Sequence, residues 1–92
     1  MSNQKIDDLA KKMKALANNK RLEILYLISD SELSVGQIEN MVNLSQSALS
    51  QHLAVLRREN VVRTRREAQT IYYAIKDDVV KQVLAVLKDL CL

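Results

Sequence analysis

The chain has 92 residues, the usual length of a single domain, so we expect one domain over residues 1–92. It is 48% hydrophobic and carries a net charge of +3, yet no apolar run approaches the roughly 18–20 residues that a membrane-spanning helix needs. The sequence has no glycine-rich loop, no carboxylate pair beside a base and no metal-ligand cluster, which argues against an enzyme or a bound cofactor.

The composition also bears on partners and compartment. A domain of this size buries only about 60–65% of its unfolded surface, so the high apolar content favours association with a second copy of the chain. Residues 1–5 carry no apolar segment of a secretory signal, and one cysteine cannot form a disulfide within the chain, so we expect a cytoplasmic protein. With three Tyr and neither Phe nor Trp, the chain lacks the aromatic platforms of single-strand binders.

The first half of the chain predicts three helices. Apolar residues recur with helical spacing over residues 5–17, and Asn18-Asn19 ends this helix. Residues 20–29 are apolar nearly all round, which is typical of a buried central helix. Ser34 and Gln37 form the Ser-x-x-Gln pattern of a capping box, which predicts a short third helix.

A fourth helix, expected over residues 45–58 with Ser45 as its cap, has two different faces. Leu49, Leu53 and Leu56 form one apolar stripe. The opposite side is small, uncharged and polar, unlike an ordinary solvated face, and it consists of Ser47, Ser50, Gln51 and Ala54. Together with the turn at residues 43–44, the third and fourth helices predict a helix-turn-helix unit whose polar face suits the major groove of DNA.

The net charge is concentrated just after this helix. Residues 1–56 hold six basic and six acidic residues, and residues 68–92 hold three of each. Residues 57–67 hold five Arg and two Glu, so they account for the whole excess of +3. Arginine suits bidentate contact with phosphate, and its concentration beside a candidate reading helix favours nucleic acid as the partner.

Two strands are expected next. Asn60 can adopt the left-handed conformation that ends a helix. Residues 61–66 and 70–75 are rich in β-branched and aromatic residues, which predicts a hairpin around residues 67–69. Because the turn lacks Gly, we expect a longer loop in place of a tight two-residue turn. A basic hairpin after a helix-turn-helix is a wing that would lie along the phosphate backbone or reach the minor groove.

The final helix, expected to run to about residue 90, starts at a cap formed by Asp77 or Asp78. It carries two adjacent apolar stripes, formed by Val79, Val83, Val86 and Leu90 and by Val80, Leu84 and Leu87. This surface is broader than one small domain needs. We therefore expect a homodimer that forms through the first and last helices.

These elements define the candidate DNA-contacting residues. Ser47, Ser50 and Gln51 are the candidates for base edges, and Gln46 for a base or a phosphate. His52 lies beside the leucine stripe, where it is either packed or bonded to phosphate. The candidates for phosphate contact, in preference to an ordinary solvated charge run, are Arg57, Arg58, Arg63, Arg65 and Arg66. Arg65 and Arg66 flank the wing turn, but alternation along a strand sends them to opposite faces.

The succession of elements resembles the ArsR/SmtB family of winged-helix repressors. The string Ser45-Gln-Ser-Ala-Leu-Ser-Gln-His-Leu-x-x-Leu56 is similar to the recognition helix of that family. Residues 56–73 and 32–36 resemble the branch that contains the biofilm growth-associated repressor, the persulfide-responsive repressors and the haemolysin activator. The resemblance implies a homodimer that binds an inverted repeat in promoter DNA.

Two departures from that family bear on what the protein senses. Metal-sensing members carry cysteines in the third helix, where this chain has Ser34-Val35-Gly36, or ligands on the last helix, which here contains no His. We therefore expect no metal site. Thiol-sensing members use two cysteines. Cys91 matches the second position approximately and is a redox candidate, or an unreactive thiol, but Tyr26 occupies the first position.

The sequence thus favours a mainly α-helical winged helix-turn-helix protein that regulates transcription by binding double-stranded DNA, more as a repressor than as an activator. The alternative is a winged-helix module that binds protein, in which the arginine-rich segment docks on an acidic surface.

Overall fold

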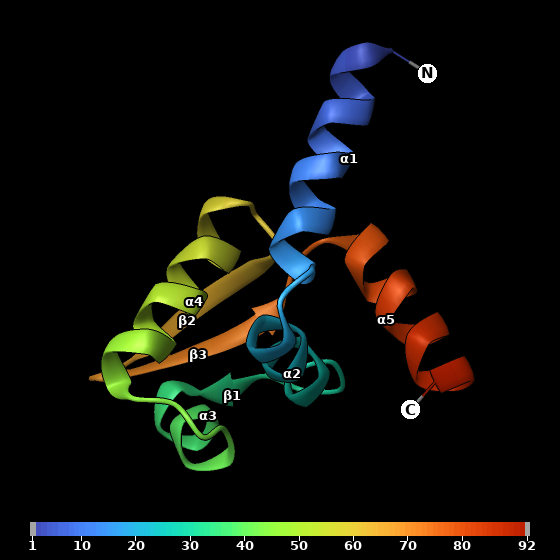
Figure 1. Ribbon diagram of the computed structural model, residues 1–92. Helices are drawn as coiled ribbons and strands as arrows, with labels where there is room; N and C mark the ends of the chain where they lie inside the picture. Colours follow the sequence, from blue (N-terminus) through green and yellow to red (C-terminus); the bar gives the residue numbers. More distant parts are fainter. Residues whose placement is uncertain (1, 92) are drawn as a thin grey trace.

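The computed structural model describes residues 2–91 as five helices and three strands. In chain order they are α1 (Asn3–Leu16), α2 (Asn19–Leu27), β1 (Leu33–Ser34), α3 (Val35–Met41), α4 (Gln46–Arg58), β2 (Val62–Glu67), β3 (Thr70–Ile75) and α5 (Asp78–Cys91). The helix-turn-helix, the hairpin and the terminal helices occur in the expected order. The winged helix-turn-helix prediction is therefore confirmed (Figure 1).

Short polar side chains set where the helices begin. The Asn18 side chain accepts hydrogen bonds from the first amides of α2. Ser34 Oγ accepts from the amide of Gln37 at 3.1 Å while Gln37 Oε1 accepts from the amide of Ser34 at 2.8 Å, which confirms the capping box. Ser45 Oγ accepts from the amide of Ala48 at 3.1 Å and starts α4. These bonds satisfy amides that have no partner within their helix.

The transition from α4 to β2 depends on Asn60. Its φ of 58° is the left-handed conformation expected at this position. The amide of Val61 then donates to the carbonyl of Leu56 at 3.0 Å and closes the end of the helix. Of the two possible caps of α5, Asp77 is the one that forms. Its Oδ1 accepts from the amide of Val80 at 3.0 Å, and α5 begins at Asp78.

The turn of the hairpin is shorter than the sequence predicted. Glu67 pairs with Thr70 in the antiparallel register, so only Ala68 and Gln69 form the turn. The longer loop was predicted because the turn has no Gly, but Ala68 itself adopts a left-handed φ of 56°. That conformation costs an alanine about 1–2 kcal/mol. The paired strands offset this cost, and Arg66 Nε adds a hydrogen bond of 3.2 Å to the carbonyl oxygen of Ala68.

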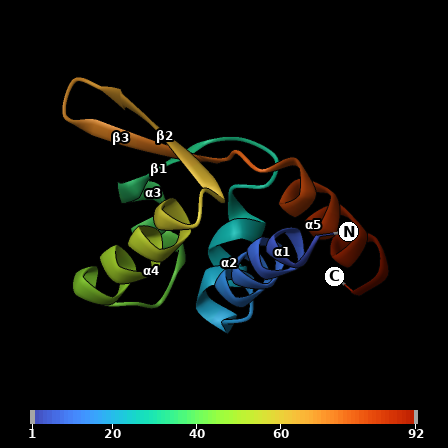
Figure 2. The same cartoon turned by 90° about the horizontal axis from the view of Figure 1, so that it is seen from above.

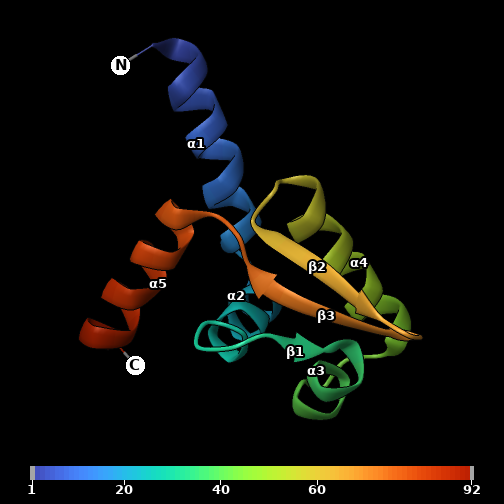
Figure 3. The ribbon, with the colours of Figure 1, turned by 180° about the vertical axis from the view of Figure 1, so that it is seen from behind.

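A third strand, β1, was not predicted. Its two residues, Leu33 and Ser34, pair with Tyr73 and Tyr72 of β3, giving an antiparallel sheet in the order β1-β3-β2 (Figure 3). Two residues are too few to show alternation in a sequence. This strand fastens the start of α3 to the hairpin, so it fixes the helix-turn-helix relative to the wing.

The core lies where α2, α3, α4 and α5 meet the sheet. Its largest fully buried side chains are Ile24, Leu25, Ile28, Ile38, Leu49, Leu56, Val61, Val80 and Leu84. The central position expected for α2 is confirmed by Ile24 and Leu25, although Tyr26 of the same helix is 44% exposed. Most of α1 projects away from this core, and α5 lies on the side of the molecule away from α4 (Figures 1 and 2). Within residues 2–91 no helix combines the length and apolarity needed to cross a bilayer.

Candidate nucleic-acid interface

The orientation of α4 is fixed by its leucine stripe. Leu49, Leu53 and Leu56 are at most 4% exposed and pack in the core. Their burial turns the opposite side of the helix outward, because residues three and four apart share one face. Ser47, Ser50, Gln51 and Ala54 are all exposed, as is Gln46 in the first turn. The structure therefore presents an uncharged, hydrogen-bonding helix face to solvent.

His52 lies on the flank of α4 that faces α2. Its Nδ1 is 3.4 Å from Nη1 of Arg21. Because a guanidinium only donates, Nδ1 is the acceptor and the ring proton resides on Nε2. Partial burial lowers the pKa of His52 below its usual 6.5, and the positive charge of Arg21 lowers it further. His52 is thus a neutral donor at pH 7, able to bond a phosphate oxygen through Nε2 without adding charge.

Arg65, predicted as a phosphate contact, is held by two carboxylates. Its Nε and Nη2 donate to Glu32 at 3.1 and 2.5 Å, and its Nη1 donates to Glu67 at 2.8 Å. The guanidinium also lies 4.4 Å from the ring centroid of Tyr72. The hydrogen bond from Arg65 lowers the pKa of Glu32 and so keeps that carboxylate ionised. This cluster fastens the wing to the segment before β1, and contact of Arg65 with phosphate stays a prediction.

The other candidate arginines are less engaged. Arg63 and Arg66 are both exposed on β2, and the register puts them opposite Ala74 and Ile71, on different faces of the hairpin. Arg66 donates to the carbonyl of Ala68 and lies next to the wing turn. Arg57 is exposed in the last turn of α4.

The remaining candidate, Cys91, is an exposed free thiol in the last residue of α5. A redox role for this thiol stays a prediction. Tyr26, at the position matched to the other sensing cysteine, lies under the ammonium of Lys88, 5.0 Å from the ring centroid. Within residues 2–91 no group of three His, Cys, Asp or Glu side chains is arranged to hold a metal.

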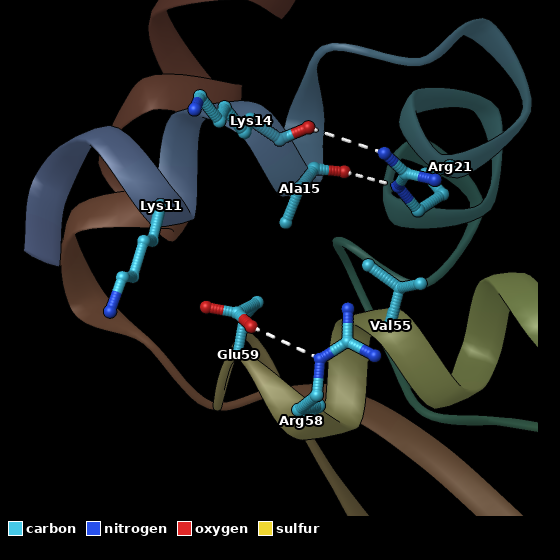
Figure 4. Close-up of a pocket in the computed structure, with 7 residues that line it drawn as sticks. All are labelled: Lys11, Lys14, Ala15, Arg21, Val55, Arg58 and Glu59. Carbon is cyan, nitrogen blue, oxygen red and sulfur yellow. Dashed lines mark hydrogen bonds and ion pairs between the residues drawn. The ribbon is translucent and has the colours of Figure 1, made fainter.

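The fold brings together a second group of cations, of which the sequence analysis had singled out only Arg58. Lys11, Lys14, Arg21 and Arg58 come from α1, α2 and α4 and line one cleft of about 360 Å³ (Figure 4). Counting charges along the chain hid this group, because acidic residues elsewhere in residues 1–56 balance its lysines. The only local signal was the three-residue spacing of Lys11 and Lys14, which places both on one face of a helix.

The comparison with known proteins agrees with this geometry. Residues 18–64 match the model of the bacterial regulatory protein, arsR family. The transcriptional activator HlyU of Vibrio cholerae is 52% identical over 75 residues, which is 82% of this chain and 69% of that protein. The biofilm growth-associated repressor of Agrobacterium fabrum is 37% identical over 75 residues, which is 82% of this chain and 64% of that protein.

Solved structures extend the likeness over the whole chain. The structure of HlyU from Vibrio cholerae has a TM-score of 0.93 at 44% identity and covers 98% of both chains. A homodimeric winged helix-turn-helix DNA-binding domain, Mb0332 from Mycobacterium bovis, has a TM-score of 0.84 at 32% identity and covers 97% of this chain and 85% of that one. The fold and the relatives together define a winged helix-turn-helix regulator of transcription. The chain belongs to the arsR family of bacterial regulatory proteins, which confirms the resemblance found in the sequence.

The position of His52 generates a prediction about its titration. Substituting Arg21→Gln removes a positive charge next to the ring, so the pKa of His52 should rise toward its usual 6.5. Because the chain has one histidine, its ring protons in a proton NMR titration report this pKa directly. Arg63→Gln, which removes an equal charge from the hairpin, should leave it unchanged. A wild-type midpoint at or above 6.5 would contradict this environment for the ring.

Proposed function

We propose that this chain regulates transcription by binding double-stranded DNA as a homodimer, with the polar face of α4 in the major groove. The observation that carries the proposal is the exposure of Ser47, Ser50 and Gln51 on the side of α4 opposite its buried leucines. Serine and glutamine side chains bond base edges, and glutamine pairs well with adenine. Membership of the arsR family supports the same role for this helix.

Phosphate contacts would hold the helix in register. The hairpin supplies Arg63, Arg65 and Arg66, and the end of α4 supplies Arg57. The tip of the hairpin lies at the same end of the molecule as the start of α4, set apart from it, so the wing reaches a different stretch of backbone (Figures 1 and 2). Arg65 is already paired with the carboxylates of Glu32 and Glu67, which offset its charge, so Arg63 and Arg66 are the less engaged cations.

A second copy of the chain is the partner that the terminal helices fit. On α5 the exposed apolar residues include Val79, Val86 and Leu90, which are 44%, 54% and 75% exposed. On α1 they are Ile6 and Met13, which are 50% and 37% exposed. An apolar surface of this kind marks an interaction site. The Mycobacterium bovis domain, which is homodimeric, supports the choice of a second copy.

A two-fold dimer presents two copies of α4, which suits an inverted repeat with half-sites about one helical turn apart. Occupying a promoter in this way excludes polymerase, so repression needs no enzymatic chemistry.

Base reading is tested by Gln51→Ala on a duplex selected from a random pool by the wild-type protein. Removing one good base contact should weaken binding to the selected duplex by about 1–3 kcal/mol and leave binding to an unrelated duplex nearly unchanged. Fluorescence anisotropy with both duplexes measures the two effects. Gln4→Ala, the same substitution at an exposed position of α1 on the side opposite Ile6 and Met13, is the matched control and should change neither.

The proposal fails if Gln51→Ala weakens binding to both duplexes equally, because Gln51 would then carry no sequence information. It also fails if the wild-type protein binds no duplex even at low salt. That second result would favour the protein-binding module with the same fold.

The dimer surface is tested by Val86→Asp, which puts a charge in the exposed apolar stripe of α5. Sedimentation should give the mass of two chains for the wild-type protein and that of one chain, 10.5 kDa, for the variant. Ala85→Asp adds the same charge at an exposed position outside that stripe and should stay dimeric. A wild-type protein that sediments as single chains at micromolar concentration would rule out this assembly.

A further inference from the structure

The basic cleft between α1, α2 and α4 is separate from the arginines of the hairpin. Its walls carry four cations, Lys11, Lys14, Arg21 and Arg58, and one carboxylate, that of Glu59 (Figure 4). Its positive charge therefore exceeds its negative charge by three. A concave surface with this imbalance attracts anions.

The four cations differ in how far they are already engaged. Arg21 donates through Nε to the carbonyl of Ala15 at 2.6 Å and through Nη2 to that of Lys14 at 3.2 Å, so its position is fixed. Arg58 is paired with Glu59 at 3.3 Å. The ammonium groups of Lys11 and Lys14 make no hydrogen bond or ion pair with any residue in the range 2–91. These two lysines are therefore the least engaged cations of the cleft.

The floor of the cleft adds no competing polar group. It is formed by the methyl group of Ala15, a residue that is 2% exposed, and by the half-buried Val55. Within the described part of the chain no polar or charged side chain is buried. The cleft thus lacks the enclosed donors with which a protein captures a small free anion. It suits an anion that is already held in place by other contacts, as a backbone phosphate of a bound duplex is.

The cleft continues the polar face of α4. Arg58 follows Gln51 by seven residues, or two helical turns, so both lie on the same side of the helix, with Ala54 between them. At about 1.5 Å per residue, the helix separates its two ends by about 20 Å. The hairpin tip lies at the level of the first end, and the cleft lies beside the last turn (Figures 1 and 4). The two basic regions therefore flank the reading face from opposite ends.

We propose that the cleft binds phosphate groups of the same duplex that α4 reads, on the opposite side of the half-site from the wing. This inference rests on the proposed DNA binding and extends it to residues of α1. Lys11 and Lys14 contact the phosphates as point charges, while Arg21 fixes the junction of α1 and α2 that carries them. The footprint of each subunit is then set by two phosphate clamps, one at each end of α4.

The double substitution Lys11→Gln with Lys14→Gln tests this clamp. Both side chains are exposed and glutamine has a similar helix propensity, so the fold should be kept, which thermal unfolding checks. Affinity should fall by the same factor on the selected and the unrelated duplex. The slope of log affinity against log salt should shrink by about one unit for each phosphate that the variant no longer neutralises.

The control removes the same charge elsewhere. Lys76→Gln with Lys81→Gln alters two exposed lysines near the start of α5 and should leave the salt slope unchanged. Phosphate ethylation interference then identifies which phosphates each protein needs. For the cleft variant, ethylation of some phosphates should no longer weaken binding. These phosphates should lie on the other side of each half-site from the phosphates to whose ethylation Arg66→Ala becomes insensitive.

The proposal is overturned if the cleft variant keeps the wild-type affinity and salt slope, or if its affinity falls no further than that of the control. It is also overturned if the cleft variant and Arg66→Ala become insensitive to the same phosphates. A wild-type protein that binds no duplex would instead refute the proposed function, so the two failures are distinct.

Discussion

The burial of three leucines on one side of α4 determines which side chains of that helix face solvent. Leu49, Leu53 and Leu56 can pack in the core in only one rotation of the helix about its axis. That rotation exposes Ser47 and Gln51 together. Truncating a leucine as deeply buried as Leu56 would cost about 2–5 kcal/mol. The chemistry of the exposed face is therefore coupled to the stability of the domain, although its side chains contribute little to that stability.

The second determinant is which cations are already paired. Along the sequence, residues 57–67 contain all of the net positive charge. In the fold, Arg65 of this segment is paired with the carboxylates of Glu32 and Glu67. Lys11 and Lys14, from the charge-balanced first half of the chain, line the same cleft, and their ammonium groups have no partner among residues 2–91. The positively charged surface is consequently broader than the arginine segment, and it extends along α4 toward α1.

Local signals in the sequence were sufficient for most of the fold. Ser34 and Ser45 cap their helices, and Asn60 ends α4, because each effect is decided by a few neighbouring residues. The two faces of α4 follow from helical periodicity alone. The exposed apolar stripe of α5 was also visible, since its residues recur at helical spacing on one element. The features that the sequence did not predict depend on contacts between distant residues. Strand β1 forms through the pairing of Leu33 with Tyr73. The basic cleft combines residues of three helices, so a count of charges along the sequence cannot reveal it.

The direction of regulation depends on the promoter as well as on the protein. In the proposed binding mode the protein supplies a reading helix and two sets of phosphate contacts, and the position of the operator decides whether bound protein excludes polymerase. HlyU is named an activator and the Agrobacterium fabrum relative a repressor, which fits one binding mode with two outcomes. The most direct test is an amide NMR spectrum of the labelled protein with and without the selected duplex. The account predicts that the backbone amides of residues 46–54 and the side-chain amide of Gln51 shift on the selected duplex, and shift differently on an unrelated one. If the protein bound the selected duplex while those signals stayed at their free positions, the polar face of α4 would not be the surface that reads DNA.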